Sequence, residues 1–206
     1  MKQPQPIDNN ADGVDDVRRQ TDMLIARFAG GDARAFDEIV AMYYDEIARL
    51  VHRLSGWQSD TDDILHEVFL IAMRKLPKFR GRSSLSTWLG RIAMNLCRAR
   101  HRRHMLWDRW FGNQRHTGKT ETETTGETTA IEQERAARVR EAIRELGPSD
   151  REVIVLHYLE QWDIDRIATT LNVRRNTVEV RLHRAKKRLA LLLDDIAEDY
   201  HVEFET

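Results

Sequence analysis

The sequence predicts an all-α protein made of two small helical domains joined by a flexible linker. Apolar residues recur at helical spacing through most of the chain, and runs of alternating β-branched residues are missing. Only four prolines occur among 206 residues. Between two periodic regions, the Thr-, Glu- and Gly-rich segment 116–129 shows no periodicity, which is typical of a linker.

The predicted domain boundaries follow these changes in pattern. Residues 1–20 are polar and acidic, so we expect a disordered tail there. The first domain is expected over 21–104, the linker over 105–130, the second domain over 131–193 and an acidic C-terminal tail over 194–206. The linker opens with three bulky aromatic residues that either extend the first domain or dock on a partner, namely Trp107, Trp110 and Phe111.

Charge is unevenly distributed along the chain. The 33 basic and 34 acidic residues nearly cancel, but 98–104 and most of 174–188 are basic, whereas both ends are acidic. Basic patches in a neutral total suggest a surface for nucleic acid, and solvated helix faces are the alternative explanation.

The single cysteine, Cys97, allows no internal disulfide, and no apolar run has membrane-spanning length. We therefore expect a cytoplasmic protein without a signal peptide.

Three helices are expected before residue 76. The first begins near residue 21 and ends before Gly30, because two glycines in a row disfavour continuation. Asp32 can cap the second helix, which is expected to end at Gly56. The third runs from about 60 to 75 and starts with acidic residues, which favour the positive end of the helix dipole.

Residues 162–189 form a helix-turn-helix pattern in the second half. Two amphipathic segments flank Asn172, where the first helix should stop. Upstream, Gly147 should break a helix, and Ser149 with Glu152 fits a capping box for the next one. In a helix-turn-helix the second helix lies in the DNA major groove.

The second helix of this pattern carries groups suited to duplex DNA. Arginine can pair with guanine, asparagine with adenine, and both can hold phosphate. The candidate duplex-contacting residues are Arg174, Arg175, Asn176, Thr177, Val180, Arg181 and Arg184. The alternative is a basic amphipathic helix that only completes a helical bundle.

Residues 79–104 combine a polar loop with a helix expected from about Leu85. Serine, threonine, arginine and aromatic groups together suit single-stranded nucleic acid, because bases stack on aromatic rings while basic groups follow the backbone. The candidate residues are Arg80, Ser86, Thr87, Trp88, Arg91, Asn95, Arg98 and Arg102. For Trp88 taken alone, packing in the core is the competing interpretation.

Two separated stretches resemble the extracytoplasmic-function sigma factors, the small two-domain initiation subunits of bacterial RNA polymerase. DTDDILHEVFLIA at 60–72 resembles the family's polymerase-binding helix, and FRGRSSLSTWLGRIAMNL at 79–96 resembles its promoter-melting segment. LGPSDREVIVLHYLE at 146–160, with IDRIATTLNV at 164–173 and TVEVRLHRAKKRL at 177–189, is similar to its second domain.

The resemblance implies a mechanism and a set of partners. The first domain would dock on the clamp of the largest polymerase subunit and open the −10 element, with an extruded base held near 79–87. The second would dock on the flap of the second subunit and bind the −35 element as duplex. The implied polymerase-binding residues are Asp62, Asp63, Glu67 and Phe69. An anti-sigma factor is a further implied partner, and no cofactor, metal or catalytic residue is expected.

The recognition helix departs from the family pattern. Asn176, Glu179 and Val180 stand where the family usually has glycine, lysine and serine, so its −35 preference should not be transferred to this chain. Glu179 could accept a hydrogen bond from cytosine. Pairing with Arg175, four residues earlier, is the interpretation we favour.

Two rival functions are compatible with parts of the sequence. A helix-turn-helix regulator acting without polymerase would explain 162–189 but would leave 60–104 without a role. A helical metalloenzyme is suggested by His66 and Glu67, but Leu70 stands where the H-E-x-x-H pattern needs its second histidine. The sequence therefore favours a sigma factor over an enzyme.

Deletion of residues 194–206 tests whether the acidic tail tempers DNA binding. No Lys or Arg follows Arg188, so the tail is a tethered polyanion next to a basic helix. If it competes with phosphate, the truncated protein should bind nonspecific duplex more tightly at low salt, and the gain should fade as salt rises. Equal affinity of both proteins across a salt series would leave a solubilising end or a docking strip for an anti-sigma protein.

Overall fold

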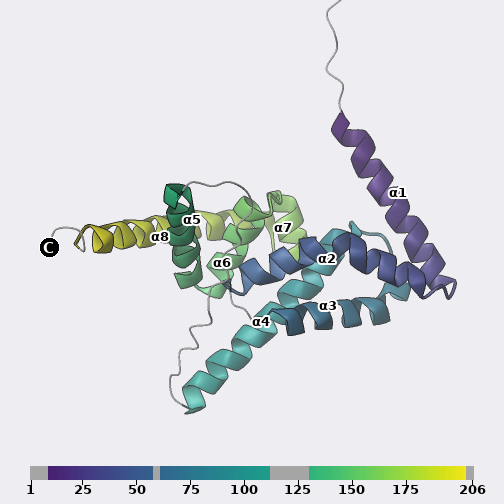
Figure 1. Ribbon diagram of the computed structural model, residues 1–206, viewed down its shortest axis with the longest axis horizontal. Helices are drawn as coiled ribbons and strands as arrows, with labels where there is room; N and C mark the ends of the chain where they lie inside the picture. The colour runs from purple at the N-terminus through teal and green to yellow at the C-terminus, as the bar shows by residue number, and fades with distance from the viewer. Residues whose placement is uncertain (1–8, 58–60, 112–129, 203–206) are drawn as a thin grey trace, which may run out of the picture.

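The structure is a computed structural model that describes residues 9–57, 61–111 and 130–202 (Figure 1). The regular elements among these residues are all helical, with no strand, which confirms the all-α prediction. The helices are α1 Asn9–Ala29, α2 Arg34–Leu54, α3 Asp62–Lys75, α4 Leu85–Phe111, α5 Ala130–Glu145, α6 Pro148–Ile154, α7 Ile164–Leu171 and α8 Arg175–Val202. A 3-10 turn, Leu76–Lys78, follows α3, and a π-helical turn, Val155–Leu159, extends α6.

The first domain is built around α2, which packs against α1, α3 and α4. Its apolar residues recur every three or four positions and form one buried stripe that includes Ile47, Leu50 and Val51. Val68 of α3 and Leu89 of α4 complete this core with exposed fractions of at most 1%. The stripe therefore fixes the position of α4, the helix that carries the predicted single-strand residues.

The second domain places α7 and α8 in a helix-turn-helix. Asp163 caps α7 by accepting a hydrogen bond from the Arg166 amide at 2.6 Å. Asn172 ends α7 in the left-handed region at φ 55°, a conformation that asparagine tolerates better than most residues. The predicted capping box is wrong, because α6 starts at Gly147 and Pro148 without a side-chain cap, and Glu152 instead pairs with Arg98.

Three helices extend beyond their predicted ends. α1 begins at Asn9, so the predicted disorder is wrong for 9–20. α4 continues through 105–111 of the predicted linker, and α8 continues to Val202 through most of the predicted tail. Once a helix is nucleated on the core, each added residue propagates it cheaply and needs no apolar stripe. The rest of the predicted linker, 112–129, lies outside the described residues.

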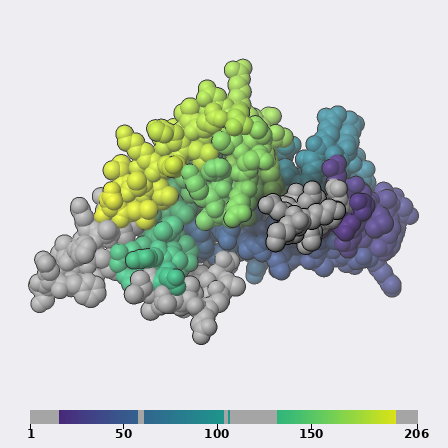
Figure 2. All heavy atoms as spheres, turned by 90° about the horizontal axis from the view of Figure 1, so that it is seen from above, coloured from purple at the N-terminus to yellow at the C-terminus, as the bar shows by residue number. Residues whose placement is uncertain are grey.

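The two domains lie directly against each other in this structure. Buried apolar residues of both halves form one continuous cluster, in which α4 contacts α7 and α2 contacts α6. In the space-filling view, green and yellow atoms of the second domain lie on blue and teal atoms of the first (Figure 2). The second domain therefore lies against α4, the helix that carries most of the predicted single-strand residues.

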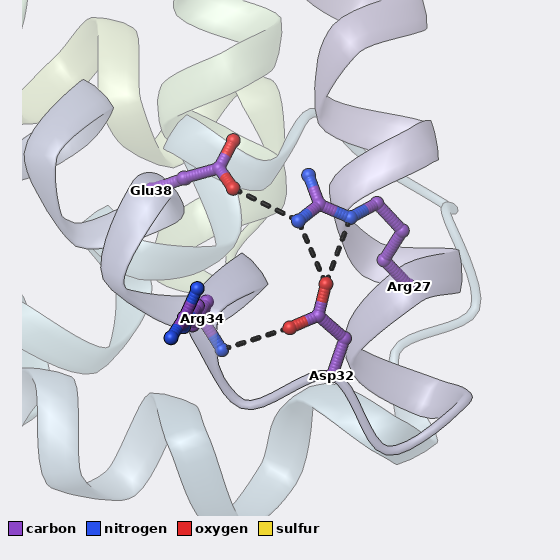
Figure 3. Close-up of polar contacts among 4 residues, drawn as sticks. All are labelled: Arg27, Asp32, Arg34 and Glu38. Atoms are coloured by element: carbon purple, nitrogen blue, oxygen red, sulfur yellow. Dashed lines mark hydrogen bonds and ion pairs between the residues drawn. The ribbon is translucent and has the colours of Figure 1, made fainter.

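A polar cluster fixes the turn between α1 and α2 (Figure 3). Asp32 accepts hydrogen bonds from the Arg27 guanidinium at 2.7 and 3.0 Å and from the backbone amide of Arg34 at 3.1 Å. Arg27 also pairs with Glu38 at 3.0 Å. The hydrogen bond from Arg27 is the main reason that the pKa of the Asp32 carboxyl is lowered. Asp32 thus binds the amide of Arg34 at the start of α2, although it is not the N-cap residue that the sequence predicted, because the N-cap is Ala33.

Replacing Asp32 with Asn should flatten the acid dependence of stability. Because the pKa of Asp32 is lower in the folded chain, its contribution is present above the unfolded-state pKa and is lost as pH falls through the folded-state pKa. Between about pH 7 and about pH 3, the Tm measured by circular dichroism should fall less in Asp32→Asn than in wild type. Asp37→Asn, on the exposed first turn of α2, should keep the wild-type slope. Equal slopes for wild type and Asp32→Asn would contradict this role.

Candidate nucleic-acid interface

The start of α8 presents the groups expected of a recognition helix. Arg174, Arg175 and Asn176 are exposed, and Val180, one turn later, is 59% exposed. Val178 is fully buried and anchors the helix in the domain. Arg175 pairs with Glu179 at 2.9 Å and with Asp165 at 2.6 Å, and these hydrogen bonds raise its pKa. The Arg175–Glu179 pair that the sequence favoured is therefore confirmed.

The other predicted residues of this helix are partly buried or paired with another side chain. Thr177 and Arg181 are half-buried, and Arg184 donates to the buried carboxylate of Asp150 at 2.8 Å. The residue that sequence analysis overlooked is His183, which is exposed one turn beyond Val180. Helical spacing from Asn176 through Val180 would have identified it, because residues at i, i+4 and i+7 share a face.

The segment 79–96, which the sequence predicted to act on single-stranded DNA, contains its own helix cap. The Ser84 hydroxyl accepts a hydrogen bond from the Thr87 amide at 3.2 Å, so Ser84 caps the first turn of α4. Trp88 is half-buried and packs on Phe79, with ring centroids 5.3 Å apart at 56°. Packing is thus the role that Trp88 has in this structure, although part of the ring stays exposed.

The predicted single-strand residues fall into two groups. Arg80, Asn95 and Arg102 are exposed. The others, Trp88 apart, contact the second domain: Ser86 and Thr87 accept from Arg166, Arg91 donates to a backbone carbonyl and Arg98 pairs with a carboxylate. The predicted residues therefore lie on α4 and, for Arg80, in the loop before it, and the second domain covers part of them.

Arg166 and Trp162 of the second domain cover the start of α4. The Arg166 guanidinium donates to the hydroxyls of Ser86 at 2.9 Å and Thr87 at 3.0 Å. It also lies 3.8 Å from the centre of the Trp162 ring, a cation–π contact. Trp162 is 3% exposed, and its ring packs on the backbone at Gly90, where a Cβ would lie 2.8 Å from the ring edge. Only glycine leaves room for this approach.

Two ion pairs join the domains beside this contact. Arg98 binds the Glu152 carboxylate with two nitrogens, at 2.5 and 2.7 Å, and this raises the pKa of Arg98. Arg53 of α2 pairs with Glu160 at 2.8 Å and donates to the carbonyl of Leu159 at 2.9 Å. Two-pronged pairing is the geometry in which arginine also holds phosphate. Glu152 therefore occupies Arg98 as a DNA backbone would.

The predicted polymerase-binding residues divide between surface and core. Asp62, Asp63 and Glu67 are exposed on α3, with Asp63 and Glu67 one turn apart. Phe69 is 9% exposed and stacks on Tyr44 with ring centroids 6.2 Å apart, so it lies on the buried side of α3, and a role for it in polymerase binding stays a prediction. Helical spacing from Glu67 points instead to the 38% exposed Leu70.

The one cysteine serves packing rather than chemistry. Burial raises the pKa of the Cys97 thiol to about 11, which keeps it protonated near neutral pH. Its sulfur lies 3.9 Å from the Ser55 hydroxyl. A protonated, enclosed thiol is a poor nucleophile.

Comparison with known families gives matches in both halves of the chain. The family model described as "Sigma-70 region 2" matches residues 39–106, and "Sigma-70, region 4" matches residues 136–189. The sigma factor SigW of Bacillus subtilis is 31% identical over 173 residues, covering 81% of this chain and 92% of SigW. The chain belongs to the extracytoplasmic-function sigma factors. This sigma factor therefore binds RNA polymerase and promoter DNA, uses the helix-turn-helix of region 4 for DNA, and is not an enzyme.

Two further similarities support this placement. The sigma-E factor of Escherichia coli is 30% identical over 174 residues, covering 81% of this chain and 91% of that protein. The solved structure of CnrH in complex with the cytosolic domain of CnrY has a TM-score of 0.62 at 26% identity, and the match covers 85% of this chain and 98% of CnrH. Among the described residues, no helix combines the length and apolar character needed to cross a bilayer.

Proposed function

We propose that this sigma factor divides promoter recognition between its two domains, with α4 acting on unpaired DNA and the start of α8 acting on duplex. The observation that carries the proposal is the different chemistry of the two surfaces. α8 presents exposed Arg174, Arg175 and Asn176 at the tip of a helix-turn-helix. α4 presents polar donors beside the Phe79–Trp88 pair, which suits unstacked bases. We assign the −35 element to α8 and the −10 element to the segment 79–102.

The same proposal assigns polymerase docking to α3. Its exposed acidic residues Asp62, Asp63 and Glu67 lie beside the exposed apolar side chains of Leu70 and Met73. A charged rim around a small apolar centre is the usual composition of a specific protein interface. We propose that this face binds the clamp of the largest polymerase subunit, and that the second domain binds the flap of the second subunit.

Two further assignments rest on the relatives. We propose that an anti-sigma protein binds this chain, supported by CnrH, whose solved structure holds the cytosolic domain of CnrY. We also propose that it acts in the cytoplasm, on the nucleoid, where core polymerase and promoter DNA are found. A regulator acting without polymerase is not retained, because region 2 is matched over residues 39–106.

Reversing two acidic charges on α3 tests the docking assignment. The double variant Asp63→Arg/Glu67→Arg should bind core polymerase at least about tenfold more weakly, because complementary charge is replaced by repulsion. Run-off transcription from start sites mapped with the wild-type protein should fall in parallel. The control Asp16→Arg/Asp37→Arg carries the same charge change on α1 and α2. Core affinity equal to that of the control would refute the docking face.

Single substitutions on the two DNA surfaces should affect different stages of initiation. Asn95→Ala should reduce promoter opening, seen as permanganate reactivity, more than closed-complex binding. Arg174→Ala should weaken closed-complex binding about tenfold, as expected for loss of one base or phosphate contact. Glu134→Gln, on the exposed surface of α5, serves as the control. If both variants lose the same fraction at both stages, the division of labour is wrong.

A further inference from the structure

We propose that Glu46 sets a base preference on the −10 surface, because it makes the Ser86 hydroxyl a hydrogen-bond acceptor that selects a base with N–H donors on its edge. The inference rests on the proposed assignment of the −10 element to α4. It adds a residue of α2 to that surface and names the base that the surface favours. Guanine is preferred at one position of the unpaired strand, and thymine is disfavoured there. Glu46 acts through Ser86 and is therefore a positioning residue.

The packing of α2 on α4 places the Glu46 carboxylate. Leu50, one turn after Glu46, lies against Gly90, one turn after Ser86, and a Cβ at Gly90 would be 3.4 Å from the Leu50 side chain. Because both helices advance by one turn between these pairs, the close approach at Leu50 brings Glu46 to Ser86. The Ser86 hydroxyl donates to Oε1 of Glu46 at 2.5 Å, and both residues are half-buried. The core of the first domain therefore fixes this hydrogen bond.

The hydrogen bond to Glu46 decides what else Ser86 can bind. A serine hydroxyl has one proton and two lone pairs, and the proton turns toward the available acceptor. A carboxylate accepts and cannot donate, so the Ser86 proton is committed to Glu46. The neighbouring Thr87 hydroxyl lies 2.8 Å from Ser84 Oγ, which can take its proton in the same way. Two adjacent oxygens in the first turn of α4 are thereby left as acceptors for a further partner.

The Arg166 guanidinium shows which chemistry these two oxygens bind. Its Nε donates to Thr87 at 3.0 Å, and a terminal nitrogen donates to Ser86 at 2.9 Å. The two hydroxyl oxygens thus hold a planar group that carries two adjacent N–H donors. The Watson–Crick edge of guanine has such a pair, N1–H and N2–H, on a flat ring. Adenine and cytosine offer one amino group there, and thymine offers a single N–H between two carbonyl oxygens.

The order of preference follows from the cost of an unmatched edge. The two donors of guanine satisfy Ser86 and Thr87, whereas the carbonyl oxygens of thymine would face the lone pairs of these acceptors. A bound base excludes water from both oxygens, so an acceptor left unpaired there costs free energy. Sites built to hydrogen-bond one ligand therefore reject analogues that lack its donors. Guanine should bind most tightly and thymine least, with adenine and cytosine between them.

The charge of Glu46 distinguishes base selection from phosphate binding. Affinity for a nucleic-acid strand comes mainly from cations that neutralise phosphates, and a carboxylate beside the strand opposes it. Glu46 therefore lowers affinity for every sequence while it raises selectivity. Removal of its charge should raise affinity for a disfavoured base and lower the preference at the same time. A purely structural role predicts a different result, an equal loss of affinity for all bases.

The test measures base preference in the complete holoenzyme. The probes are labelled single-stranded oligonucleotides of the −10 region of a promoter mapped with the wild-type protein, in which each position is changed in turn to all four bases. Wild type with core polymerase should bind guanine at least about tenfold more tightly than thymine at one position. In Glu46→Gln, whose amide can donate to Ser86, this ratio should fall below about threefold. The thymine oligonucleotide should then bind more tightly than it binds to wild type.

Matched variants separate this role from charge and from damage. Asp45→Asn removes one negative charge from the exposed neighbouring position of α2 and should keep the wild-type ratio. Ser86→Ala removes the acceptor itself and should lower the ratio as Glu46→Gln does. The double variant should lower it no further, because Glu46 acts through Ser86. A ratio in Glu46→Gln equal to that in Asp45→Asn would overturn the proposal, as would an equal loss of affinity for all four bases.

The proposed function and this inference fail in different ways. Holoenzyme that binds none of the single-stranded oligonucleotides refutes the assignment of the −10 element to α4, and the role of Glu46 falls with it. Holoenzyme that binds them without preferring guanine to thymine at any position refutes the role of Glu46 alone. The same holds for a preference that Glu46→Gln leaves intact.

Discussion

The packing of the Trp162 ring on the bare backbone at Gly90 determines how the two domains meet. With the ring seated there, Arg166 lies on the indole face and reaches the first turn of α4. Glu152 and Glu160 then come opposite Arg98 and Arg53. The polar contacts depend on the aromatic one, because hydrogen bonds and ion pairs need fixed geometry while an apolar ring excludes water around them.

This arrangement satisfies most of the polar side chains on the first half of α4. In this structure, hydroxyls and guanidinium groups of α4 are satisfied by the second domain.

The surfaces outside this contact remain accessible. Asp63 and Glu67 on α3 and Asn176 and Val180 on α8 are exposed while α4 is covered.

By itself the sequence determined the helical class, the helix-turn-helix and the family, because apolar spacing and breakers such as Asn172 act within a few residues. Tertiary structure alone decided the contact between the domains. Ser86 and Arg98 bind groups 80 and 54 residues away in the chain. Patterns of neighbouring residues carry no information about contacts between residues so far apart in the chain. Gly90 was the one visible trace, and the reason for its missing side chain, the ring of Trp162, becomes apparent only when the chain is folded.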